Sequence, residues 1–535
     1  MRSFLSQRLE SMRPEVPVQT ISELVQARAQ DSRDRVLVSF RGKNTTYGQV
    51  HGSVQELAGA LRQAGVKPGD RVGLMLGQSV EHLELFLAIA WIGAIMVPFS
   101  IHLKSAGIEL QLASSRPSLM VASRSHADPI RAACRAVADR PVLVWFEDGV
   151  DPAGETHLNA LLRSSRAVAD PVIRGPEDTV SIMYTSGTTG APKGAVLSER
   201  NWVVGAKTTG LIAEARRDDV FHFWEPFYHG SAWIVFTLAL QQGLKLHMVE
   251  RFSASRLWEQ MIEAGATKLH YLGGLVNIIL AQPESPSDRG HKVSVAWGGA
   301  CPAGSWRQFE ERFGVHVREG YGLTEAGMFS HLNLDGVVGS MGKPIEEYES
   351  WIEDEKGQRA APGVVGELVV RPIGPSVGMT EYWGEPEKTR EVLRNGCIYT
   401  GDYAMMDDKG YFFFKGRKKD ALRRRGENIS AWEVERVINA GPGVEESAVI
   451  GVDSDMGEQE VMAIVKMREG EPGDALGLLK FCADRLAYYQ VPRYWQFVED
   501  FPRGPTQRIV KREIEVDLTQ AWDAEKEGVK PTRNA

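Results

Sequence analysis

A run of glycines, hydroxyl side chains and one lysine is the most chemically suggestive segment of the chain. It reads TSGTTGAPKG at 185–194 and follows an apolar stretch at 180–185. Glycines let backbone N–H groups approach phosphate oxygens, hydroxyls add donors, and Lys193 supplies a positive charge. The spacing is not that of a Walker A loop, which needs Gly-Lys followed by serine or threonine. The segment therefore predicts a phosphate-binding loop of another kind.

Two later segments carry oxygen-rich side chains in glycine-containing runs. In EGYGLTEAG, at 319–327, Thr324 offers a hydroxyl to a phosphate, and Glu325 offers the hard oxygen that Mg²⁺ prefers alongside substrate phosphates. In YTGD, at 399–402, Asp402 can accept two hydroxyl hydrogens at once, which suits a ribose diol. Taken alone, Asp402 is equally typical of a turn and Glu325 of a solvated surface, so their neighbours decide the interpretation.

The order of these segments resembles that of the adenylate-forming superfamily, which comprises acyl-CoA ligases, peptide-synthetase adenylation domains and luciferases. TSGTTGAPKG is similar to its signature loop, EGYGLTEAG to its second nucleotide segment, and YTGD to its ribose-binding segment. GRKKDALRRRGENIS, at 416–430, is similar to its hinge region. Within the superfamily, the chain resembles CoA ligases of carnitine-like and bile-acid-like carboxylates. The resemblance implies ATP, Mg²⁺ and coenzyme A as cofactors or co-substrates.

The resemblance also assigns roles to single residues. Thr185 and Glu325 would hold Mg²⁺, Arg417 would contact the ribose beside Asp402, and Gly426 would line the pantetheine tunnel. The arginines at 423–425 would meet CoA phosphates or form a solvated basic face. The other implied nucleotide contacts are Ser186, Gly187, Thr188, Thr189, Gly190, Lys193, Gly299, Ala300, Glu319, Gly320, Tyr321, Gly322 and Thr324.

Two further segments are expected to surround the acyl group. WGGACPAGS, at 297–305, resembles the strand end beside the adenine and the acyl pocket, where glycine permits close backbone approach. FWEPFYHGSAW, at 223–233, resembles the segment in which an aromatic residue or histidine gates the acyl and thiol sites, so His229 is the candidate gate. An apolar acid is expected. The pocket candidates are His229, Trp233, Trp297, Gly298 and Met328.

The implied reaction has two steps. The substrate carboxylate attacks the α-phosphate of ATP, which forms an acyl-AMP and releases pyrophosphate, and coenzyme A then displaces AMP to give a thioester. Catalysis of the first step is mainly positioning and charge stabilisation, with Thr324, Glu325 and a bridging cation as the catalytic groups. In the superfamily the bridging cation is a lysine within a Pro-Thr-Gly-Lys-like turn.

The chain departs from the superfamily at this lysine. FPRGPTQRIVKREI, at 501–514, places Arg508 at the lysine position and Lys511 three residues later. On a straight strand these two side chains point to opposite faces, so one of them would point inward. We expect Arg508 or Lys511 to serve the first step, and a compact ammonium fits between two anions more easily than a guanidinium, which favours Lys511.

Three alternative functions share some of these features. An amide synthetase would offer the acyl-AMP to an amine, whereas a non-catalytic nucleotide-binding protein would form no AMP at all. A phosphotransferase would release ADP rather than AMP.

The alternation of apolar runs and amphipathic stretches indicates how these segments are positioned. Strand-like runs such as RVGLML at 71–76 alternate with helical spacing from about 50 to 300, which predicts parallel α/β layers. We expect an α/β N-terminal domain at 1–416, made of two layered α/β subdomains and a small β-subdomain. A hinge at 417–420, centred on Lys419, would lead to a small mobile α+β domain at 421–535. Its expected helices lie near 430–440 and 474–488, and its strands near 446–452 and 460–467.

Composition and charge exclude several classes of protein. With 535 residues and a net charge of −8, the chain has dispersed lysines and arginines, so no nucleic-acid partner is expected. Its four cysteines form no CxxC pair, which argues against zinc and disulfides and favours the reducing cytoplasm. The longest apolar run, 85–99, is shorter than the roughly 20 residues of a membrane span and should be a buried helix leading into a strand. Expected partners are a small carboxylic acid and CoA, and a homodimer is compatible with the sequence.

Overall fold

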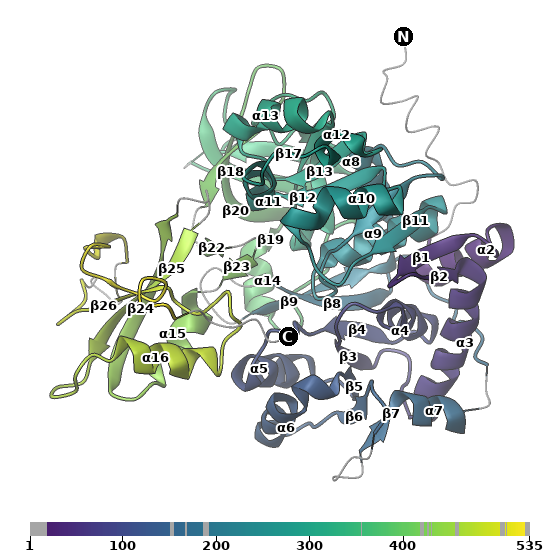
Figure 1. Ribbon diagram of the computed structural model, residues 1–535, viewed down its shortest axis with the longest axis horizontal. Coiled ribbons are helices and arrows are strands. Elements are labelled where there is room, and N and C mark those ends of the chain that lie inside the picture. Colours follow the sequence, from purple (N-terminus) through teal and green to yellow (C-terminus); the bar gives the residue numbers. More distant parts are fainter. Residues whose placement is uncertain are drawn as a thin grey trace.

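The computed structural model describes residues 19–149, 155–165, 168–185, 192–354, 356–417, 422–424, 427–429, 431–454, 459–502, 509 and 511–529. Figure 1 shows a large N-terminal domain and, to one side of it, a small C-terminal domain that contains α15, α16 and β24 to β26. The large domain holds two extended sheets and a smaller antiparallel sheet. The expected α/β architecture with a small second domain is confirmed.

The first extended sheet has seven strands in the order β7-β6-β5-β3-β4-β8-β9. Its neighbours are parallel except for β8 and β9, which form an antiparallel pair. The central strand β5 is buried along its whole length, as expected for a parallel sheet covered on both faces. The strands are β3 (Arg71–Met75), β4 (Ile95–Pro98), β5 (Leu119–Ala122), β6 (Val142–Trp145), β7 (Thr156–His157), β8 (Thr179–Thr185) and β9 (Lys193–Ser198).

The second extended sheet has nine strands in the order β16-β15-β14-β13-β12-β10-β11-β1-β2. Strands β1 and β10 to β14 are parallel, and the antiparallel strands lie at the two edges. The strands are β1 (Val36–Phe40), β2 (Lys43–Thr46), β10 (Val220–Phe223), β11 (Lys245–Met248), β12 (Lys268–Leu272), β13 (Val295–Gly299), β14 (His316–Leu323), β15 (Met328–Asn333) and β16 (Lys343–Pro344).

Two apolar helices connect the cores of these sheets. Helix α4 (Val80–Trp91) and helix α9 (Gly230–Gln242) share one buried cluster with β3 of the first sheet and β11 of the second. Because α4 runs directly toward β4, the apolar stretch 85–99 is a buried helix leading into a strand, as expected. Along the described part of the chain, we find no helix whose length and apolar character would let it cross a membrane.

The other helices cover the outer faces or join the strands. Helix α8 (Glu199–Ala213) begins at Ser198, whose hydroxyl accepts a hydrogen bond from the backbone N–H of Asn201 and so satisfies a donor that the first turn leaves open. The remaining helices of the large domain are α2 (Ile21–Asp31), α3 (Tyr47–Gln63), α5 (Ser105–Ser115), α6 (Ala127–Ala136), α7 (Leu158–Ser164), α10 (Leu257–Ala264), α11 (Gly273–Leu280), α12 (Ser287–Gly290), α13 (Ala303–Phe313) and α14 (Pro386–Val392).

The expected β-subdomain is an antiparallel sheet with its own buried cluster. Its long strand β20 pairs with β18 on one side and with β21 on the other. A turn at Gly401, where φ is +70°, interrupts β20 just before Asp402 and suits glycine. The strands are β17 (Tyr348–Glu353), β18 (Val365–Pro372), β19 (Leu393–Arg394), β20 (Cys397–Met406) and β21 (Phe412–Arg417).

The small domain begins with a hairpin and packs two helices against a four-stranded sheet of order β24-β25-β26-β27. Its buried cluster contains residues from Leu422 to Ala524 and none from the large domain. The division at 417–420 stays a prediction, and Lys419 lies outside the described residues. The elements are β22 (Leu422–Arg424), β23 (Glu427–Ile429), α15 (Ala431–Asn439), β24 (Val444–Asp453), β25 (Gln459–Met467), α16 (Ala475–Ala483), β26 (Tyr494–Phe497) and β27 (Trp522–Asp523).

All four cysteines have free thiols and are buried: Cys134, Cys301, Cys397 and Cys482. Burial raises the pKa of each thiol, and for Cys482 the pKa reaches about 12. Because the thiolate is the reactive form, these side chains are poor nucleophiles where they lie.

Candidate functional site

A cavity of about 1170 Å³ lies between the two domains. On the large domain it is bounded by the carboxyl ends of β10, β12, β13 and β14 and by the base of the β8–β9 hairpin. Glu427, Gln459, Tyr489 and Gln490 of the small domain form another part of the wall. Carboxyl ends of parallel strands are where open α/β sheets hold their ligands.

The two ends of the glycine-rich loop meet at the wall of this cavity. Thr185 ends β8 and pairs in the antiparallel ladder with Lys193, which begins β9. Both residues line the cavity, as expected for a loop that carries phosphates. The predicted contacts Ser186, Gly187, Thr188, Thr189 and Gly190 lie outside the described residues.

Tyr382 links Lys193 to Glu325 and was not identified from the sequence. The Lys193 ammonium lies 4.8 Å from the centroid of the Tyr382 ring, and the Tyr382 hydroxyl donates to Oε1 of Glu325 at 2.6 Å. Burial and the Glu325 carboxylate raise the pKa of Tyr382 well above its usual range, so the hydroxyl stays a donor. No motif in the sequence marks Tyr382, because its role depends on a contact between segments 57 residues apart.

Thr324 and Glu325 lie together at this part of the wall. They begin a single 3-10 turn, Thr324–Ala326, directly after β14. Gly322 precedes them, and a Cβ there would lie 1.8 Å from the carbonyl oxygen of Met328 on the paired strand. Only glycine fits this close approach, which brings the two strands together beneath Thr324.

Glu319 serves the fold of the cavity wall. Its carboxylate accepts hydrogen bonds from the backbone N–H of Ala300, from the N–H of Cys301 at 3.0 Å, and from the hydroxyl of Tyr271 at 2.6 Å. These bonds hold Ala300 in the left-handed region at φ +63°, which is unusual for a residue with a Cβ. Glu319 also lines the cavity, and its expected contact with the nucleotide stays a prediction.

The expected ribose-binding group lies opposite the second nucleotide segment. Asp402 is buried, and Oδ2 of its carboxylate accepts a hydrogen bond from the Tyr321 hydroxyl at 2.7 Å. In the β20–β21 ladder Asp402 pairs with Arg417, so the two residues predicted to meet the ribose are neighbours along the sheet. Tyr321 and Asp402 line the cavity together with Gly320 and Gly322.

His229 contacts the small domain across the cavity. Its Nε2 lies 2.9 Å from Oε2 of Glu427, and the Tyr228 hydroxyl lies 3.4 Å from Oε1 of the same carboxylate. Burial acts to raise the pKa of Glu427, but the charge and hydrogen bond of His229, helped by His102, hold it below its usual value. The candidate gate is therefore held by a small-domain carboxylate, which the sequence did not single out.

Three of the predicted pocket residues lie behind the cavity wall. Trp233 is fully buried and packs its ring 4.6 Å from that of Phe86, and Trp297 is fully buried on the central strand β13. Gly298 lies where a Cβ would meet the carbonyl oxygen of Tyr271 at 1.9 Å. These residues were predicted to line the acyl pocket, and the structure places them in the core because aromatic residues next to strand ends also fill the space between sheet and helices. Met328, Gly299 and Ala300 do line the cavity.

Lys511 does not reach the cavity in this arrangement of the domains. It begins a 3-10 turn, Lys511–Glu513, rather than lying on a straight strand, so the expected opposition of faces does not apply. Its Nζ lies 2.5 Å from Oε1 of Glu435 and donates to the carbonyl of Val449 at 3.1 Å, both within the small domain. Arg508 and Gly426 lie outside the described residues.

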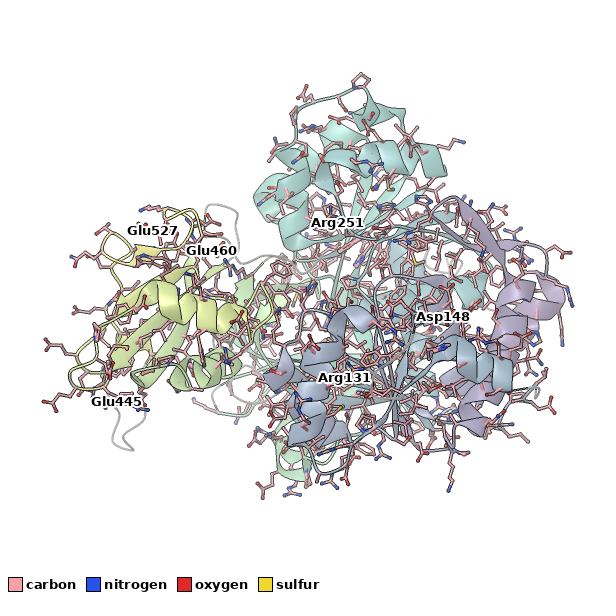
Figure 2. All side chains as sticks on the ribbon, turned by 60° about the horizontal axis from the view of Figure 1, so that its bottom comes forward. Arg131, Asp148, Arg251, Glu445, Glu460 and Glu527 are labelled. Carbon is pink, nitrogen blue, oxygen red and sulfur yellow. The ribbon has the colours of Figure 1, made fainter. Side chains whose placement is uncertain are left out.

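Arg424 contradicts the expected role of the arginine run at 423–425. It is 3% exposed, and its Nη2 lies 2.5 Å from Oε2 of Glu460, which Figure 2 labels on the small domain. Nη1 of Arg424 donates to the carbonyls of Tyr489 and Val491. Since its guanidinium is buried and bound to a carboxylate and two backbone carbonyls, Arg424 is neither part of a solvated basic face nor exposed to a CoA phosphate.

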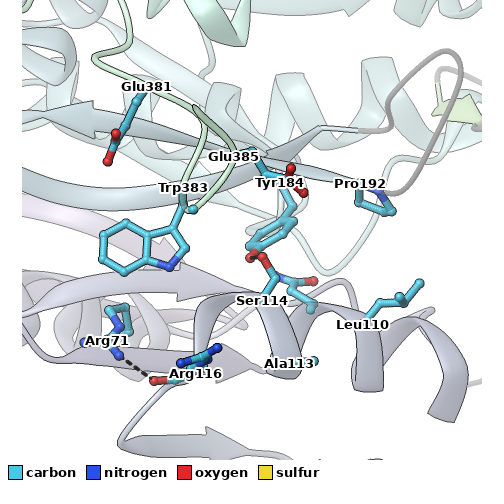
Figure 3. Close-up of a pocket in the computed structure, with 12 residues that line it drawn as sticks. Arg71, Leu110, Ala113, Ser114, Arg116, Tyr184, Pro192, Glu381, Trp383 and Glu385 are labelled. Atoms are coloured by element: carbon cyan, nitrogen blue, oxygen red, sulfur yellow. Dashed lines mark hydrogen bonds between the residues drawn. The ribbon is translucent and has the colours of Figure 1, made fainter. Parts of the chain in front are cut away.

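A second, smaller cavity of about 690 Å³ adjoins the first, and the two share Gln111, Tyr184 and Pro192 (Figure 3). Arg71 lies on its floor, where it donates to the carbonyl of Arg116 at 2.9 Å and lies 5.4 Å from the Trp383 ring. These guanidinium contacts are made within the protein, and Glu381 and Glu385 also line the space. The smaller cavity therefore forms a polar side branch of the larger one.

No group of three metal-ligating side chains occurs in the described ranges. The carboxylate of Glu325 and the hydroxyl of Thr185 both belong to residues that line the cavity. This donor set fits Mg²⁺, which usually takes one or two carboxylates and completes its shell with water and substrate phosphates.

Comparison with known families and proteins gives a consistent result. Residues 25–383 match the AMP-binding enzyme family, and residues 433–508 match the AMP-binding enzyme C-terminal domain. The chain is 27% identical over 493 residues to the crotonobetaine/carnitine–CoA ligase of Salmonella heidelberg (strain SL476), which covers 88% of this chain and 92% of the relative.

Two solved structures share the fold. A double mutant of o-succinylbenzoate CoA synthetase from Bacillus subtilis matches with a TM-score of 0.81 and 22% identity, over 92% of this chain and 98% of the other. The amide bond synthetase McbA from Marinactinospora thermotolerans matches with a TM-score of 0.82 and 23% identity, again over 92% and 98%. At these identities the likeness concerns the fold.

Proposed function

The chain belongs to the AMP-binding enzyme family, and from that premise we propose that it is an AMP-forming acyl-CoA ligase. It activates a carboxylic acid with ATP to give an acyl-AMP and pyrophosphate, and coenzyme A then takes the acyl group as a thioester. A relative that is 27% identical is named crotonobetaine/carnitine–CoA ligase, which supports a CoA ligase.

One observation carries the proposal. Groups suited to a phosphate, a metal and a ribose line a single cavity, although they come from three separate segments of the chain. These groups are Thr185, Lys193, Thr324, Glu325 and Asp402. A protein that binds only a phosphate needs no ribose site, so the set favours a nucleotide, and the AMP-binding family favours AMP over ADP as the product.

In the first step the protein positions the reactants and stabilises charge. The Lys193 ammonium attracts the negatively charged phosphates, and the Tyr382 ring beneath it keeps it at the cavity wall. The Thr324 hydroxyl donates to a phosphate oxygen, while the Asp402 carboxylate accepts the ribose hydroxyls. As the substrate carboxylate forms its bond to the α-phosphorus, the bond to the bridging oxygen breaks and pyrophosphate leaves with its electron pair.

Glu325 and Thr185 are the residues proposed to hold Mg²⁺. The Tyr382 hydroxyl already fixes Oε1 of Glu325, so the carboxylate is oriented before any metal arrives. When bound, Mg²⁺ supplies positive charge that stabilises the leaving pyrophosphate. No other carboxylate is required, since substrate phosphates fill the remaining positions.

The two steps need two positions of the small domain. Lys511 faces Glu435 within the small domain, so bridging of the carboxylate and the α-phosphate by Lys511 requires a rotation of the small domain, for which Lys419 is the expected hinge. The arrangement described here, with Glu427 on His229, instead leaves the cavity bounded by Gln459, Tyr489 and Gln490. We assign this arrangement to acyl transfer, in which the CoA sulfur attacks the acyl carbon and AMP leaves.

The test combines ATP, Mg²⁺ and a panel of acids, and measures AMP and pyrophosphate. Aryl, medium-chain and polycyclic acids and short betaines belong in the panel. Acid-dependent AMP is expected, and addition of CoA should give a product whose mass equals that of the acid plus CoA less one water. ADP as product, or no AMP with any acid, would refute the proposal. If added amines give an amide while CoA gives no thioester, the acyl acceptor is an amine rather than CoA.

Since ATP and CoA are both cytoplasmic metabolites, we propose the cytoplasm as the place of action. A homodimer remains a prediction, and gel filtration at known concentration tests it.

A further inference from the structure

A buried glutamate–histidine pair stands in the wall of the large cavity. Glu225 follows β10 and His270 lies on the neighbouring strand β12, and the two are 1% and 3% exposed. Oε1 of Glu225 lies 2.7 Å from Nδ1 of His270. Both residues line the cavity, and neither belongs to the groups assigned above to ATP, Mg²⁺ or CoA.

The pair is held rigidly by its neighbours. The Trp224 backbone N–H donates to Oε2 of Glu225 at 2.9 Å, and the Trp224 indole N–H donates to the carbonyl of His270 at 3.1 Å. The imidazole lies between two indole rings, with centroids 4.2 Å from Trp297 and 5.7 Å from Trp224 and planes within 19° and 23° of parallel. Trp297 does not line the cavity itself, but by stacking it fixes the plane of the His270 imidazole, which does.

The hydrogen bonds leave one nitrogen of the ring for a ligand. An ionised carboxylate only accepts, so Nδ1 carries a hydrogen and donates to Glu225. Among the described residues, none bonds to Nε2. Nε2 of His270 is accessible from the cavity. In this it differs from ring nitrogens of His82, His222 and His331, which are enclosed by protein and have no hydrogen-bond partner. Nε2 is thus the part of the ring that meets the cavity.

A pair of this kind is a poor way to stabilise a fold. Taking two ionisable groups out of water costs free energy, and well-packed apolar side chains of similar volume often do as well or better. Because the neighbours of His270 are indole rings, apolar side chains in place of Glu225 and His270 would pack well against them. The polar edge of His270 in an otherwise aromatic part of the wall therefore points to recognition of a substrate.

We propose that His270, positioned by Glu225, reads a hydroxyl group on the acyl part of the substrate, so that the preferred acids are hydroxylated. A hydroxyl accepts from Nε2–H when the imidazole is protonated and donates to Nε2 when it is neutral, so it matches either state of the ring. A bound acid that lacks the hydroxyl covers Nε2 and leaves it without a partner, which costs binding energy. The proposal rests on the proposed function and revises the expectation of a purely apolar acid.

The test uses matched pairs of acids that differ by one hydroxyl, with pyrophosphate release as the readout. Suitable pairs are 4-hydroxybenzoate and benzoate, 4-hydroxycinnamate and cinnamate, and carnitine and γ-butyrobetaine. For at least one pair, the wild-type protein should show a kcat/KM that is about 10- to 100-fold higher for the hydroxylated acid.

Two variants then assign the preference to the pair. His270→Leu should bring the ratio within a pair to near one, chiefly through loss of activity with the hydroxylated acid. Glu225→Gln, which changes almost no volume, should reduce the ratio because the amide no longer holds a charge beside Nδ1. His222→Leu is the matched control, since His222 is buried on β10 but does not line the cavity, and its ratio should equal that of the wild type.

The outcomes separate this inference from the proposed function. Acid-dependent pyrophosphate without preference in any pair, or an unchanged ratio in both His270→Leu and Glu225→Gln, would overturn the role of His270 and leave the ligase function standing. Absence of acid-dependent pyrophosphate with every acid would refute the ligase function, and this inference with it. If His270→Leu does not fold, the ratio measured with the isosteric Glu225→Gln variant decides whether the pair determines the preference.

Discussion

Glu427, on strand β23 of the small domain, lies 2.9 Å from Nε2 of His229, which directly precedes helix α9 of the large domain. The contact joins the two domains at the cavity and can exist only while the small domain occupies the position described here. It therefore provides a way to perturb one step of the reaction and spare the other.

Glu427→Gln is expected to slow acyl transfer to CoA. Loss of a charge-assisted hydrogen bond should lower the rate of thioester formation by about tenfold, while pyrophosphate exchange should stay within about twofold of the wild type. Single-turnover transfer from preformed acyl-AMP, compared with exchange, measures the two effects. The control is Glu469→Gln, an exposed residue of the same domain. Equal losses in both assays would contradict the assignment of this contact to the second step.

Tyr382→Phe should weaken the first step through Glu325. The variant keeps the ring beneath Lys193 and removes the hydroxyl that orients the carboxylate, so kcat/KM for pyrophosphate exchange should fall by about 10-fold. Because the carboxylate is proposed to hold Mg²⁺, the concentration of Mg²⁺ for half-maximal activity should rise. Tyr411→Phe is the control, since the Tyr411 hydroxyl donates to Asp335 at 2.6 Å on the surface. An unchanged Mg²⁺ dependence in Tyr382→Phe would remove Glu325 from the metal site.

Lys511→Ala and Arg508→Ala, made separately, test which cation bridges the reactants. The variant that removes the bridging charge should lose pyrophosphate exchange by about 100-fold or more, with little change in transfer from preformed acyl-AMP. Lys511→Ala should also release Glu435 from its ion pair, so its melting temperature needs to be measured beside its activity. Near wild-type exchange in both variants would mean that neither residue bridges.

Gly322→Ala is expected to destabilise the large domain. A Cβ would lie 1.8 Å from the Met328 carbonyl oxygen, so β14 and β15 would have to separate, at a cost of about 3 kcal/mol or more. Thermal unfolding should show a lower melting temperature and a loss of ATP-induced stabilisation. Gly304→Ala, where a Cβ meets nothing within 4 Å, is the matched control and should unfold like the wild type.

Glu84, on the buried helix α4, should make stability depend on pH. Burial raises the pKa of Glu84 from 4.5 to about 7. The folded chain therefore keeps a proton there that the unfolded chain releases, so its contribution is fully present below about pH 4.5 and is lost as the pH rises to about 7. Glu84→Gln cannot ionise and should gain roughly 3 kcal/mol relative to the wild type across this range.

Unfolding of the wild type and Glu84→Gln in urea, at several pH values across this range, gives the difference in free energy. Glu81→Gln, an exposed residue on the same helix, should show no such trend. A difference that stays constant with pH would mean that Glu84 keeps an ordinary pKa in the folded protein.

Most of the predicted site residues that line the cavity are those whose neighbours along the chain determine their position. Thr324 and Glu325 follow a strand directly, and Thr185 and Lys193 end a hairpin, so local spacing was enough to bring them to one cavity edge. The strands and helices of the α/β layers follow from apolar periodicity for the same reason. Asp402 was found through a short motif and is held by Tyr321, a residue of another motif.

Contacts between distant segments account for what the sequence did not predict. Tyr382, Glu427 and the Glu225–His270 pair act through partners that are 45 to 198 residues away. Trp233 and Trp297 were expected in the acyl pocket because their segments resemble those around the acyl group, and such a resemblance does not show which way each side chain points. The comparison of Lys511 with Arg508 considered a straight strand, whereas Lys511 begins a 3-10 turn and pairs with Glu435.

The burial of the four native thiols makes the domain movement accessible to spectroscopy. Their raised pKa values and enclosure leave them slow to react with maleimide dyes, so a cysteine introduced at exposed Glu387 and another at exposed Asp484 should be labelled first. Energy transfer between the two dyes would then follow each rotation of the small domain during turnover, with the native cysteines left in place.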